Sequence, residues 1–331
     1  MERMGTIAVL GGGSWATALA KLVADKRQPF VWFMRRQDRI DEFRKYGRNP
    51  MYLTDVSFDT AQIEFCVDIN EAVRRADTLI VAFPSPYLKP QIERLSVDIS
   101  EKNIVSAVKG IVPDDNLIVT DYFMERYGCR RENMLVIGGP CHAEEVALQR
   151  LSYLTIGGVD PMKARAFAAI LAGKKMRTIV SDDIDGIEYG AVLKNIYAIA
   201  GGIISGMKAG DNFMAMMVSN AIREMRRFVD TVSPMRRDIC ESAYLGDLLG
   251  TAYSKFSRNH NFGAMIGKGY SVQAAQMEMS QTAEGYYGSK CIHEINSRYG
   301  VSMPIAEAIY SILYERENPR KAFLDIAPTF T

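Results

Sequence analysis

Lys194 stands out among the lysines because it lies in the run YGAVLKNIYAIAGG, which contains hardly any other charged side chain. A lysine inside a buried helix is costly, since its amine loses hydration, unless it is paired or has a function. The alternative is a structural lysine whose stem is buried and whose charged end reaches water. Lys194 is therefore a candidate functional amine.

A second group of polar residues lies further along the chain, in YLGDLLGTAYSKFSRN. Asp247 is followed there by the adjacent residues Ser257, Arg258 and Asn259. Hydroxyl, guanidinium and amide donors in a row suit a small phosphorylated ligand, because a phosphate accepts several hydrogen bonds at once. The same pattern also fits a helix cap followed by a loop.

The stretch IAVLGGGSWATALA, residues 7–20, passes from an apolar strand through three glycines into an alanine-rich helix. Gly11, Gly13 and Ala16 fit the pattern GxGxxG/A. In that pattern the first glycine makes the tight turn, the second lets a diphosphate approach the backbone, and the small third residue lets the helix pack on the strand. The turn predicts a dinucleotide site. A glycine-rich turn that binds nothing, or an S-adenosylmethionine site, would share the pattern.

The end of the second strand bears on which dinucleotide binds. NAD-selective sites usually carry Asp or Glu about 20 residues after the glycines. Here FVWFMRRQD offers Arg35 and Arg36 instead, and arginine can bind the 2′-phosphate of NADP. Arg35 is nearer the strand end, so we expect NADPH to be used at least as well as NADH. For Arg36, an ordinary solvated basic side chain before a helix is an equal alternative.

These residues need elements to position them, and the first half of the chain alternates strand-like and helical runs. The strand-like runs are TIAVLG, FVWFM, DTLIVAF, NIVSAVKG, NMLVIGG and SYLTIGG. Such alternation predicts a doubly wound parallel sheet with crossover helices on both faces. Lys109 closes one of these runs, where strand ends face a ligand crevice, although a single lysine there is more often merely exposed.

From Asp185 onward the chain is helical in character. The main runs are IEYGAVLKNIYAIAGGIISGM, NFMAMMVSNAIREMRRFV, AAQMEMSQTAEGYYGSKCIHEI and IAEAIYSILYE. A chain of 331 residues is also long for a single core. We therefore predict an α/β protein of two domains. Residues 1–182 form a Rossmann-type dinucleotide-binding domain, and residues 183–331 form an all-helical substrate-binding and catalytic domain.

Composition limits the classes of function. Forty Lys and Arg against 39 Asp and Glu leave a net charge of +1, so no overall field favours nucleic acid or an anionic membrane surface. Five cysteines without CxxC pairing and the lack of a signal peptide predict a reduced, cytoplasmic protein. No apolar run is long enough for membrane insertion. Three scattered histidines give no metal-ligand spacing.

Methionine-rich runs in the sequence bear on the oligomeric state. The methionine-rich runs FMAMMV and MEM could supply the apolar face of a homodimer, although such methionines more often pack in a core.

Taken together, the motifs resemble those of the bacterial-type NAD(P)-dependent sn-glycerol-3-phosphate dehydrogenases along nearly the whole chain. The motifs are GGGSWATALA, NPMYL, FPSPYL, VKGI, GGPCHAEEVA, EYGAVLKNIYAIAGG, LGDLLGTAYSKFSRN, FGAMIGKGYS and AEGYYGSK. The resemblance implies reversible hydride transfer between NAD(P)H and dihydroxyacetone phosphate. The product would be sn-glycerol 3-phosphate for glycerophospholipid synthesis.

The resemblance also implies roles for single residues. Lys194 would exchange a proton at the substrate oxygen, and Lys109 would touch both substrate and cofactor. Further substrate contacts would be Gly139, Cys141, Asp247, Ser257, Arg258 and Asn259. Further cofactor contacts would be Gly11, Gly13, Ser14, Trp15, Arg35, Ala143, Arg258 and Glu284. These roles suit the reaction, because a dianionic substrate needs fixed donors and a ketone oxygen needs a proton.

Three departures from the family pattern are visible. Gly12 and Ala16 replace an alanine and a glycine of the turn, which keeps both positions small. Cys141 and His142 stand where a small hydroxyl residue or asparagine and then an aromatic residue are common. Thr282 lies where a valine is usual.

Three other classes of protein share part of the pattern. A non-catalytic dinucleotide sensor would be expected to lack Lys194 or Arg258, and both are present. A methyltransferase would favour an acidic end of the second strand and would not need the helical domain. Another two-domain dehydrogenase, acting on a 3-hydroxy acid or a sugar acid, shares the architecture and is the main alternative.

Overall fold

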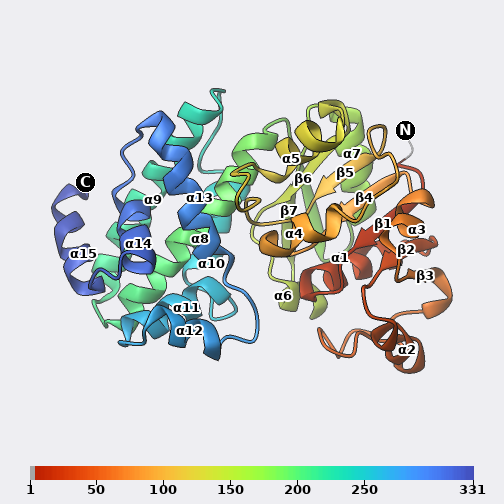
Figure 1. Ribbon diagram of the computed structural model, residues 1–331, viewed down its shortest axis with the longest axis horizontal. Coiled ribbons are helices and arrows are strands. Elements are labelled where there is room, and N and C mark those ends of the chain that lie inside the picture. The colour runs from red at the N-terminus through yellow and green to blue at the C-terminus, as the bar shows by residue number, and fades with distance from the viewer. Residues whose placement is uncertain (1–3) are drawn as a thin grey trace. The chain divides into compact units, whose positions relative to one another are not determined.

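The computed structural model describes residues 4–331, and the chain divides into two compact units (Figure 1). The first unit comprises the chain up to Val108 together with Val119–Ile184. The second comprises Lys109–Ile118 together with Asp185–Thr331. The chain therefore enters the second unit briefly, returns to the first, and then continues in the second to its end. We call the segment 109–118 the excursion, and Lys109 is its first residue.

An eight-stranded sheet forms the centre of the first unit, in the order β3-β2-β1-β4-β5-β6-β7-β8. Its strands are β1 (Ile7–Leu10), β2 (Phe30–Phe33), β3 (Ile63–Cys66), β4 (Thr78–Val81), β5 (Asn103–Ser106), β6 (Met134–Gly138), β7 (Ser152–Gly157) and β8 (Met176–Ser181). Neighbouring strands are parallel, with Leu10 opposite both Phe33 and Val81, except that β6 and β7 are antiparallel. The predicted doubly wound α/β fold is confirmed, and the sheet contains one antiparallel pair that the sequence pattern does not predict.

The antiparallel strands β6 and β7 are joined by residues 139–151, which contain one short helix. Helix α6 (Ala143–Ala147) between β6 and β7 has only five residues. At 1.5 Å per residue it spans about 7.5 Å, while a strand as long as β6 spans about 17 Å. The helix is therefore shorter than the strand before it, and β7 runs back beside β6 with Val136 opposite Gly157.

Helices cover both faces of the sheet. Besides α6 they are α1 (Ser14–Ala24), α2 (Gln37–Tyr46), α3 (Ile69–Arg74), α4 (Ser85–Ile92), α5 (Val119–Tyr127) and α7 (Pro161–Leu171). The chain moves from β1 to β2 in one direction and from β3 back to β4 in the other. Right-handed crossovers therefore place α1 and α3 on opposite faces. Coverage of both faces explains why every residue of β1, β2 and β4 is buried.

An aromatic cluster fills the core beside β2. The ring of Trp32 lies 5.2 Å from that of Phe43, 5.5 Å from Phe58 and 5.9 Å from Phe65, measured between centroids. Trp32 has no exposed surface. These contacts pack α2, the loop that follows it, and β3 against β2, and they hold the indole ring in one orientation.

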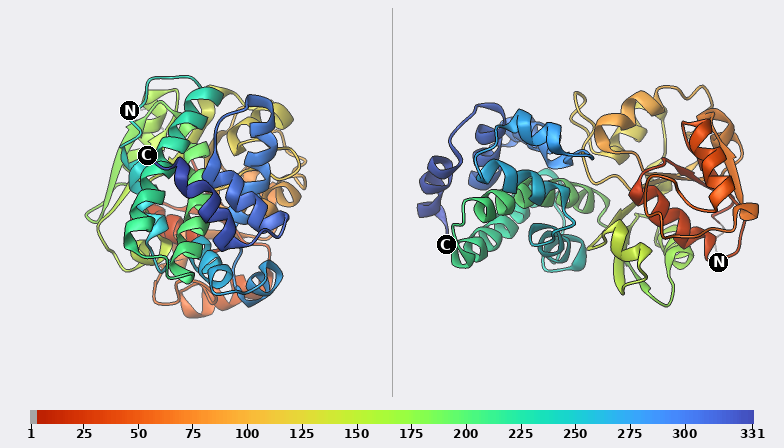
Figure 2. Two further views of the ribbon diagram at one scale, coloured as in Figure 1. Left: turned by 90° about the vertical axis from the view of Figure 1, so that its left-hand side faces the viewer. Right: turned by 90° about the horizontal axis from the view of Figure 1, so that it is seen from below.

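The second unit is built of helices packed around α8 (Figure 2). They are α8 (Ile184–Gly206), α9 (Asp211–Val232), α10 (Asp247–Ala252), α11 (Arg258–Gly267), α12 (Val272–Glu278), α13 (Glu284–Tyr299), α14 (Pro304–Tyr314) and α15 (Pro319–Ile326). Helix α8 is buried along nearly its whole length, as expected for a helix that is apolar all round. Within the described chain, no helix combines the length and apolarity that a bilayer span requires.

Candidate active site

Asp247 joins the two candidate lysines in the second unit. Its Oδ1 lies 2.5 Å from Nζ of Lys194, and its Oδ2 lies 3.3 Å from Nζ of Lys109. Lys194 comes from the middle of α8, Asp247 is the first residue of α10, and Lys109 begins the segment 109–118. All three are candidate residues from the sequence, and the structure brings their side chains into one cluster.

Two further residues complete the cluster. Thr251, one turn after Asp247 on α10, accepts a hydrogen bond from Nζ of Lys194 at 3.0 Å and donates to the Asp247 carbonyl at 2.6 Å. Asn195 donates from Nδ2 to the carbonyl of Lys109 at 2.7 Å and so ties the excursion to α8. Neither residue is predicted from the sequence. Their only signals were the four-residue spacing from Asp247 and the position next to Lys194.

Burial controls the charges of this cluster. The side chains of Lys194 and Asp247 are 5% and 2% exposed. Burial lowers the pKa of Lys194 to about 8; the carboxylate of Asp247 opposes this shift and the charge of Lys109 adds to it. Burial raises the pKa of Asp247, but the two lysine charges outweigh burial, so the pKa of this carboxyl lies below its ordinary value. Near neutral pH, Lys194 is an ammonium that can lose its proton readily.

Ser257, Arg258 and Asn259 lie at the start of α11. Ser257 is the N-cap of the helix, and its Oγ accepts the N–H of His260 at 3.2 Å. Asn259 is buried, and its Oδ1 accepts the N–H of Gly285 at 2.9 Å, which links α11 to the start of α13. The serine hydroxyl and the asparagine amide each keep a donor for a ligand.

Arg258 differs from its neighbours. Its side chain is half-buried, and its guanidinium has no partner among the described residues. A guanidinium in that state can give two parallel hydrogen bonds to a phosphate.

Close packing of glycines fixes α11 against α8. A Cβ added at Gly263 would lie 2.1 Å from the carbonyl oxygen of Ile199, and one at Gly202 would lie 2.0 Å from that of His260. Gly206 and Gly267 repeat these contacts one turn later. Since Lys194 lies on the same helix, this contact sets the position of residues 257–259 relative to the amine. The glycines four residues apart in GGIISG and FGAMIG were the available signal.

The glycine turn of the first unit has the geometry that a dinucleotide needs. Gly11 has φ +133°, and an added Cβ would lie 2.6 Å from the carbonyl oxygen of Ala82, so only glycine fits. Gly13 is the N-cap of α1 and gives no side-chain cap, and an added Cβ would find no atom within 4 Å. Ser14 and Trp15 form the first turn of α1. Open space beside an uncapped helix N-terminus fits the diphosphate of NAD(P).

The two arginines after β2 have different surroundings. Arg36 pairs with Asp38 at the start of α2, with 3.0 Å between Nε and Oδ1. Arg35 is exposed and has no partner in the described chain. The pairing supports the structural interpretation of Arg36 and leaves Arg35 as the candidate contact for a 2′-phosphate.

Three further predicted contacts follow β6 in the first unit. Gly139 has φ +99°, Cys141 is buried, and Ala143 begins α6 after its N-cap, His142. The fourth, Glu284, is the first residue of α13 in the second unit. The roles of these residues toward substrate and cofactor stay predictions. No group of His, Cys, Asp and Glu side chains in the described chain could hold a metal ion.

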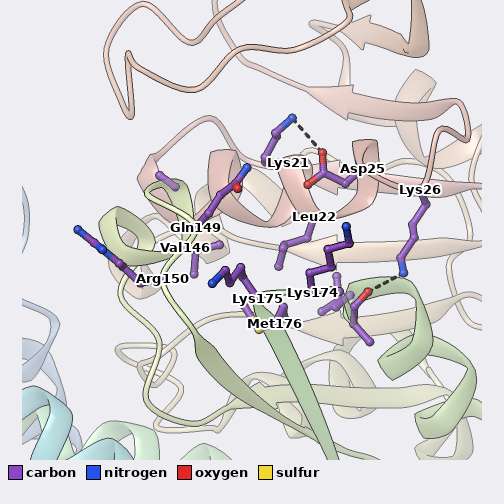
Figure 3. A pocket seen from close by; sticks show the side chains of 14 residues that line it. Lys21, Leu22, Asp25, Lys26, Val146, Gln149, Arg150, Lys174, Lys175 and Met176 are labelled. Atoms are coloured by element: carbon purple, nitrogen blue, oxygen red, sulfur yellow. Dashed lines mark hydrogen bonds and ion pairs between the residues drawn. The ribbon is translucent and has the colours of Figure 1, made fainter.

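A separate hollow of about 330 Å³ lies in the first unit at the ends of α1, α6 and α7 (Figure 3). Helix ends leave carbonyl groups unpaired and carry partial negative charge. Lys26 satisfies one such carbonyl, since it donates to Ala172, the C-cap of α7, at 2.6 Å, whereas Lys21 pairs with the carboxylate of Asp25 at 2.9 Å. The hollow contains none of the predicted site residues.

Comparison with known proteins identifies the same family in both halves of the chain. Residues 6–164 and 183–324 match the N-terminal and C-terminal family models of NAD-dependent glycerol-3-phosphate dehydrogenase. Glycerol-3-phosphate dehydrogenases [NAD(P)+] of Bacillus pumilus and Carboxydothermus hydrogenoformans are each 32% identical, over 94% and 97% of this chain and 91% and 95% of their own. The crystal structure of the Coxiella burnetii glycerol-3-phosphate dehydrogenase superposes with a TM-score of 0.90 at 28% identity and covers 98% of both chains. A D-mandelate dehydrogenase at 14% identity and TM-score 0.61 shares the fold.

Proposed function

The chain belongs to the NAD-dependent glycerol-3-phosphate dehydrogenase family, and we propose that the cluster of Lys109, Asp247 and Lys194 is its catalytic centre. The protein is an NAD(P)-dependent oxidoreductase that interconverts dihydroxyacetone phosphate and sn-glycerol 3-phosphate, the latter for glycerophospholipid synthesis. NAD(P)H, when bound, supplies a hydride to the carbonyl carbon. The observation that carries the proposal for the centre is the buried Lys194, whose pKa of about 8 suits proton exchange at the substrate oxygen.

Lys194 acts as acid and base. In the reductive direction its ammonium gives a proton to the ketone oxygen, and in the oxidative direction the neutral amine takes the hydroxyl proton. Asp247 and Thr251 hold the amine at 2.5 Å and 3.0 Å, which fixes its direction. Lys109 adds a second positive charge that stabilises the negative charge developing on the oxygen.

The substrate phosphate is bound by Arg258, with Ser257 and Asn259 as further donors. The half-buried, unpartnered guanidinium of Arg258 supports this assignment, as does the contact between α8 and α11 that holds it relative to Lys194. Gly139 and Cys141 contribute further substrate contacts. This assignment rests on the family resemblance.

The cofactor diphosphate is bound at the turn of Gly11 and Gly13 and at the first turn of α1, with Ser14 and Trp15. Arg35 binds a 2′-phosphate, so NADPH serves at least as well as NADH. The resemblance adds Lys109, Arg258, Ala143 and Glu284 as cofactor contacts.

The setting of the protein is also part of the proposal. We place it in the cytoplasm, because no disulfide joins the five cysteines and Cys240 is exposed. A homodimer without nucleic-acid partners is proposed as the working form. Exposed Met216 on α9 supports an apolar contact between copies, whereas Met214 and Met217 of the same run are buried in the core.

A substrate panel tests the reaction. NADPH oxidation is followed with dihydroxyacetone phosphate, with dihydroxyacetone, and with a 3-oxo acid. We expect turnover with the phosphorylated ketone and very poor turnover with the other two, because Arg258 has then no phosphate to bind. Preferred use of the 3-oxo acid would contradict the proposal and favour a hydroxy-acid dehydrogenase.

A further inference from the structure

The carbonyls of three consecutive glycines each accept a side-chain donor. Nε1 of Trp32 donates to the carbonyl of Gly11 at 2.7 Å. Nδ2 of Asn49 donates to the carbonyl of Gly12 at 3.2 Å. Oγ1 of Thr17 donates to the carbonyl of Gly13 at 2.9 Å. The three donors come from β2, from the loop after α2, and from α1, so separate elements converge on one turn.

Asn49 connects this network. It is 1% exposed, and its Nδ2 also donates to Oγ1 of Thr17 at 2.8 Å. Its Oδ1 accepts the backbone N–H groups of Met51 and Tyr52 at 3.0 and 3.2 Å. Because a backbone N–H can only donate, these two bonds fix which end of the amide is oxygen. The amide nitrogen must therefore face the turn.

Because of the geometry of the peptide bond, the hydrogen bonds to these carbonyls also orient the N–H groups on the other side of the turn. In a planar trans peptide, the C=O of one residue and the N–H of the next point in opposite directions. Tying the carbonyls of Gly11, Gly12 and Gly13 therefore aims the N–H groups of Gly12, Gly13 and Ser14 away from Trp32, Asn49 and Thr17. Within the described chain, none of these three N–H groups donates a hydrogen bond.

We propose that Trp32, Asn49 and Thr17 are positioning residues that hold the N–H groups of the glycine turn ready for the cofactor diphosphate. Three glycines in a row lose much conformational entropy when they become ordered, and that loss would weaken cofactor binding if it occurred only on binding. The side-chain anchors order the turn when the chain folds. This inference rests on the proposed cofactor site.

The test uses conservative variants that delete one donor each. Trp32→Phe keeps an aromatic ring and removes the N–H, and Thr17→Val keeps the shape and removes the hydroxyl. Phe65→Leu disturbs the same aromatic cluster without touching the turn. Thr78→Val removes another buried hydroxyl of the first unit, which donates to the carbonyl of Met4. These last two variants are the matched controls.

The readout separates the diphosphate from the rest of the cofactor. Inhibition constants against NADPH are measured for 2′-phospho-ADP-ribose, which carries the diphosphate, and for adenosine 2′-monophosphate, which lacks it. Each variant removes one hydrogen bond to a glycine carbonyl, and Thr17→Val also removes the bond from Asn49. We expect each to weaken the first inhibitor about five- to tenfold and to leave the second unchanged. The KM for dihydroxyacetone phosphate should stay near the wild-type value, and the controls should bind both inhibitors normally.

Two results would overturn the inference. If Thr17→Val and Trp32→Phe bind 2′-phospho-ADP-ribose as tightly as their controls, the anchors do not serve the diphosphate. If they weaken both inhibitors equally, their role is general stability. In both cases wild-type turnover of dihydroxyacetone phosphate would leave the proposed function intact. Failure of the wild-type protein to bind the first inhibitor would instead contradict the cofactor site itself. If Trp32→Phe does not fold, Thr17→Val alone decides.

Discussion

Asp247 is shared by two amines, and this sharing decides how tightly Lys194 holds its proton. The burial of α8 favours the neutral amine, the carboxylate favours the ammonium, and burial has the larger effect. Lys194 could be predicted from the sequence because its apolar neighbours are adjacent to it along the chain. The same pattern could not show whether burial or the carboxylate has the larger effect on its pKa. Thr251 and Asn195 could not be named, because their contacts join residues 57 and 86 positions apart.

Replacement of Lys194 tests the proton transfer. Lys194→Met removes the acid and base but keeps the volume of the side chain, so kcat should fall by about a hundredfold or more in both directions. The dissociation constant of NADPH, measured by fluorescence, should stay close to that of the wild type. Near-normal turnover would point to Lys109 as the proton donor instead.

The pH profile tests the role of Asp247. For the wild type, the rate of glycerol 3-phosphate oxidation should rise through pH of about 8, where Lys194 becomes neutral, and reduction should decline above that pH. Asp247→Asn removes the charge that raises the pKa of Lys194, while the repulsion by Lys109 persists. The midpoint of the oxidation profile should therefore move below 8. A midpoint that stays or moves upward would show that another group titrates.

The pair of arginines after β2 offers a matched comparison. Arg35→Asp should raise the KM for NADPH at least tenfold more than the KM for NADH, because it replaces the cation that faces a 2′-phosphate with an anion. Arg36→Ala should leave the ratio of the two KM values unchanged, since Arg36 is paired with Asp38. Equal effects of the two substitutions on cofactor preference would reject the assignment of Arg35.

At the scale of elements, the strand-like runs of the sequence predict the six inner strands of the sheet but not its two outermost strands. The missed strands are β3 and β8. Inner strands are covered on both faces and show as continuous apolar runs, whereas β8 exposes Arg177, Ile179 and Val180. An edge strand forms its ladder hydrogen bonds with only one neighbouring strand. That neighbour is distant along the chain, so a short window of sequence does not reveal the pairing.

The contact between α8 and α11 is the element-scale feature that most directly supports the site. Gly263→Ala would place a methyl group 2.1 Å from the carbonyl oxygen of Ile199, so the helices must separate. Overpacking of this kind costs about 1–3 kcal/mol, and Arg258 should move away from Lys194. We expect a lower Tm and a raised KM for dihydroxyacetone phosphate. Gly173→Ala, where an added Cβ meets no atom within 4 Å, is the control. Unchanged KM in Gly263→Ala would show that α11 does not position the substrate.

At the scale of the whole molecule, the length of the chain and the change from strand-like to helical runs predict two domains, and the two units of the structure are interleaved along the chain. The excursion over residues 109–118 belongs with the helices through Lys109, which contacts Asp247 and Asn195, and through Asn116, which donates to Glu294 at 2.7 Å. Nothing in the run VKGIVPDDNLI distinguishes it from a loop of the sheet. Its place in the second unit depends on contacts with residues that lie much later in the chain.

The excursion has a consequence for the order in which the protein is made. Lys109 leaves the ribosome 86 residues before Asn195 and Asn116 leaves it 178 residues before Glu294. At about 5–20 residues per second, the segment waits roughly 4–17 seconds for its first partner and longer for its last. During that interval the strands on either side of it can already pair. Catalytic competence is therefore a late event of biosynthesis, reached only after the translated chain closes these long loops.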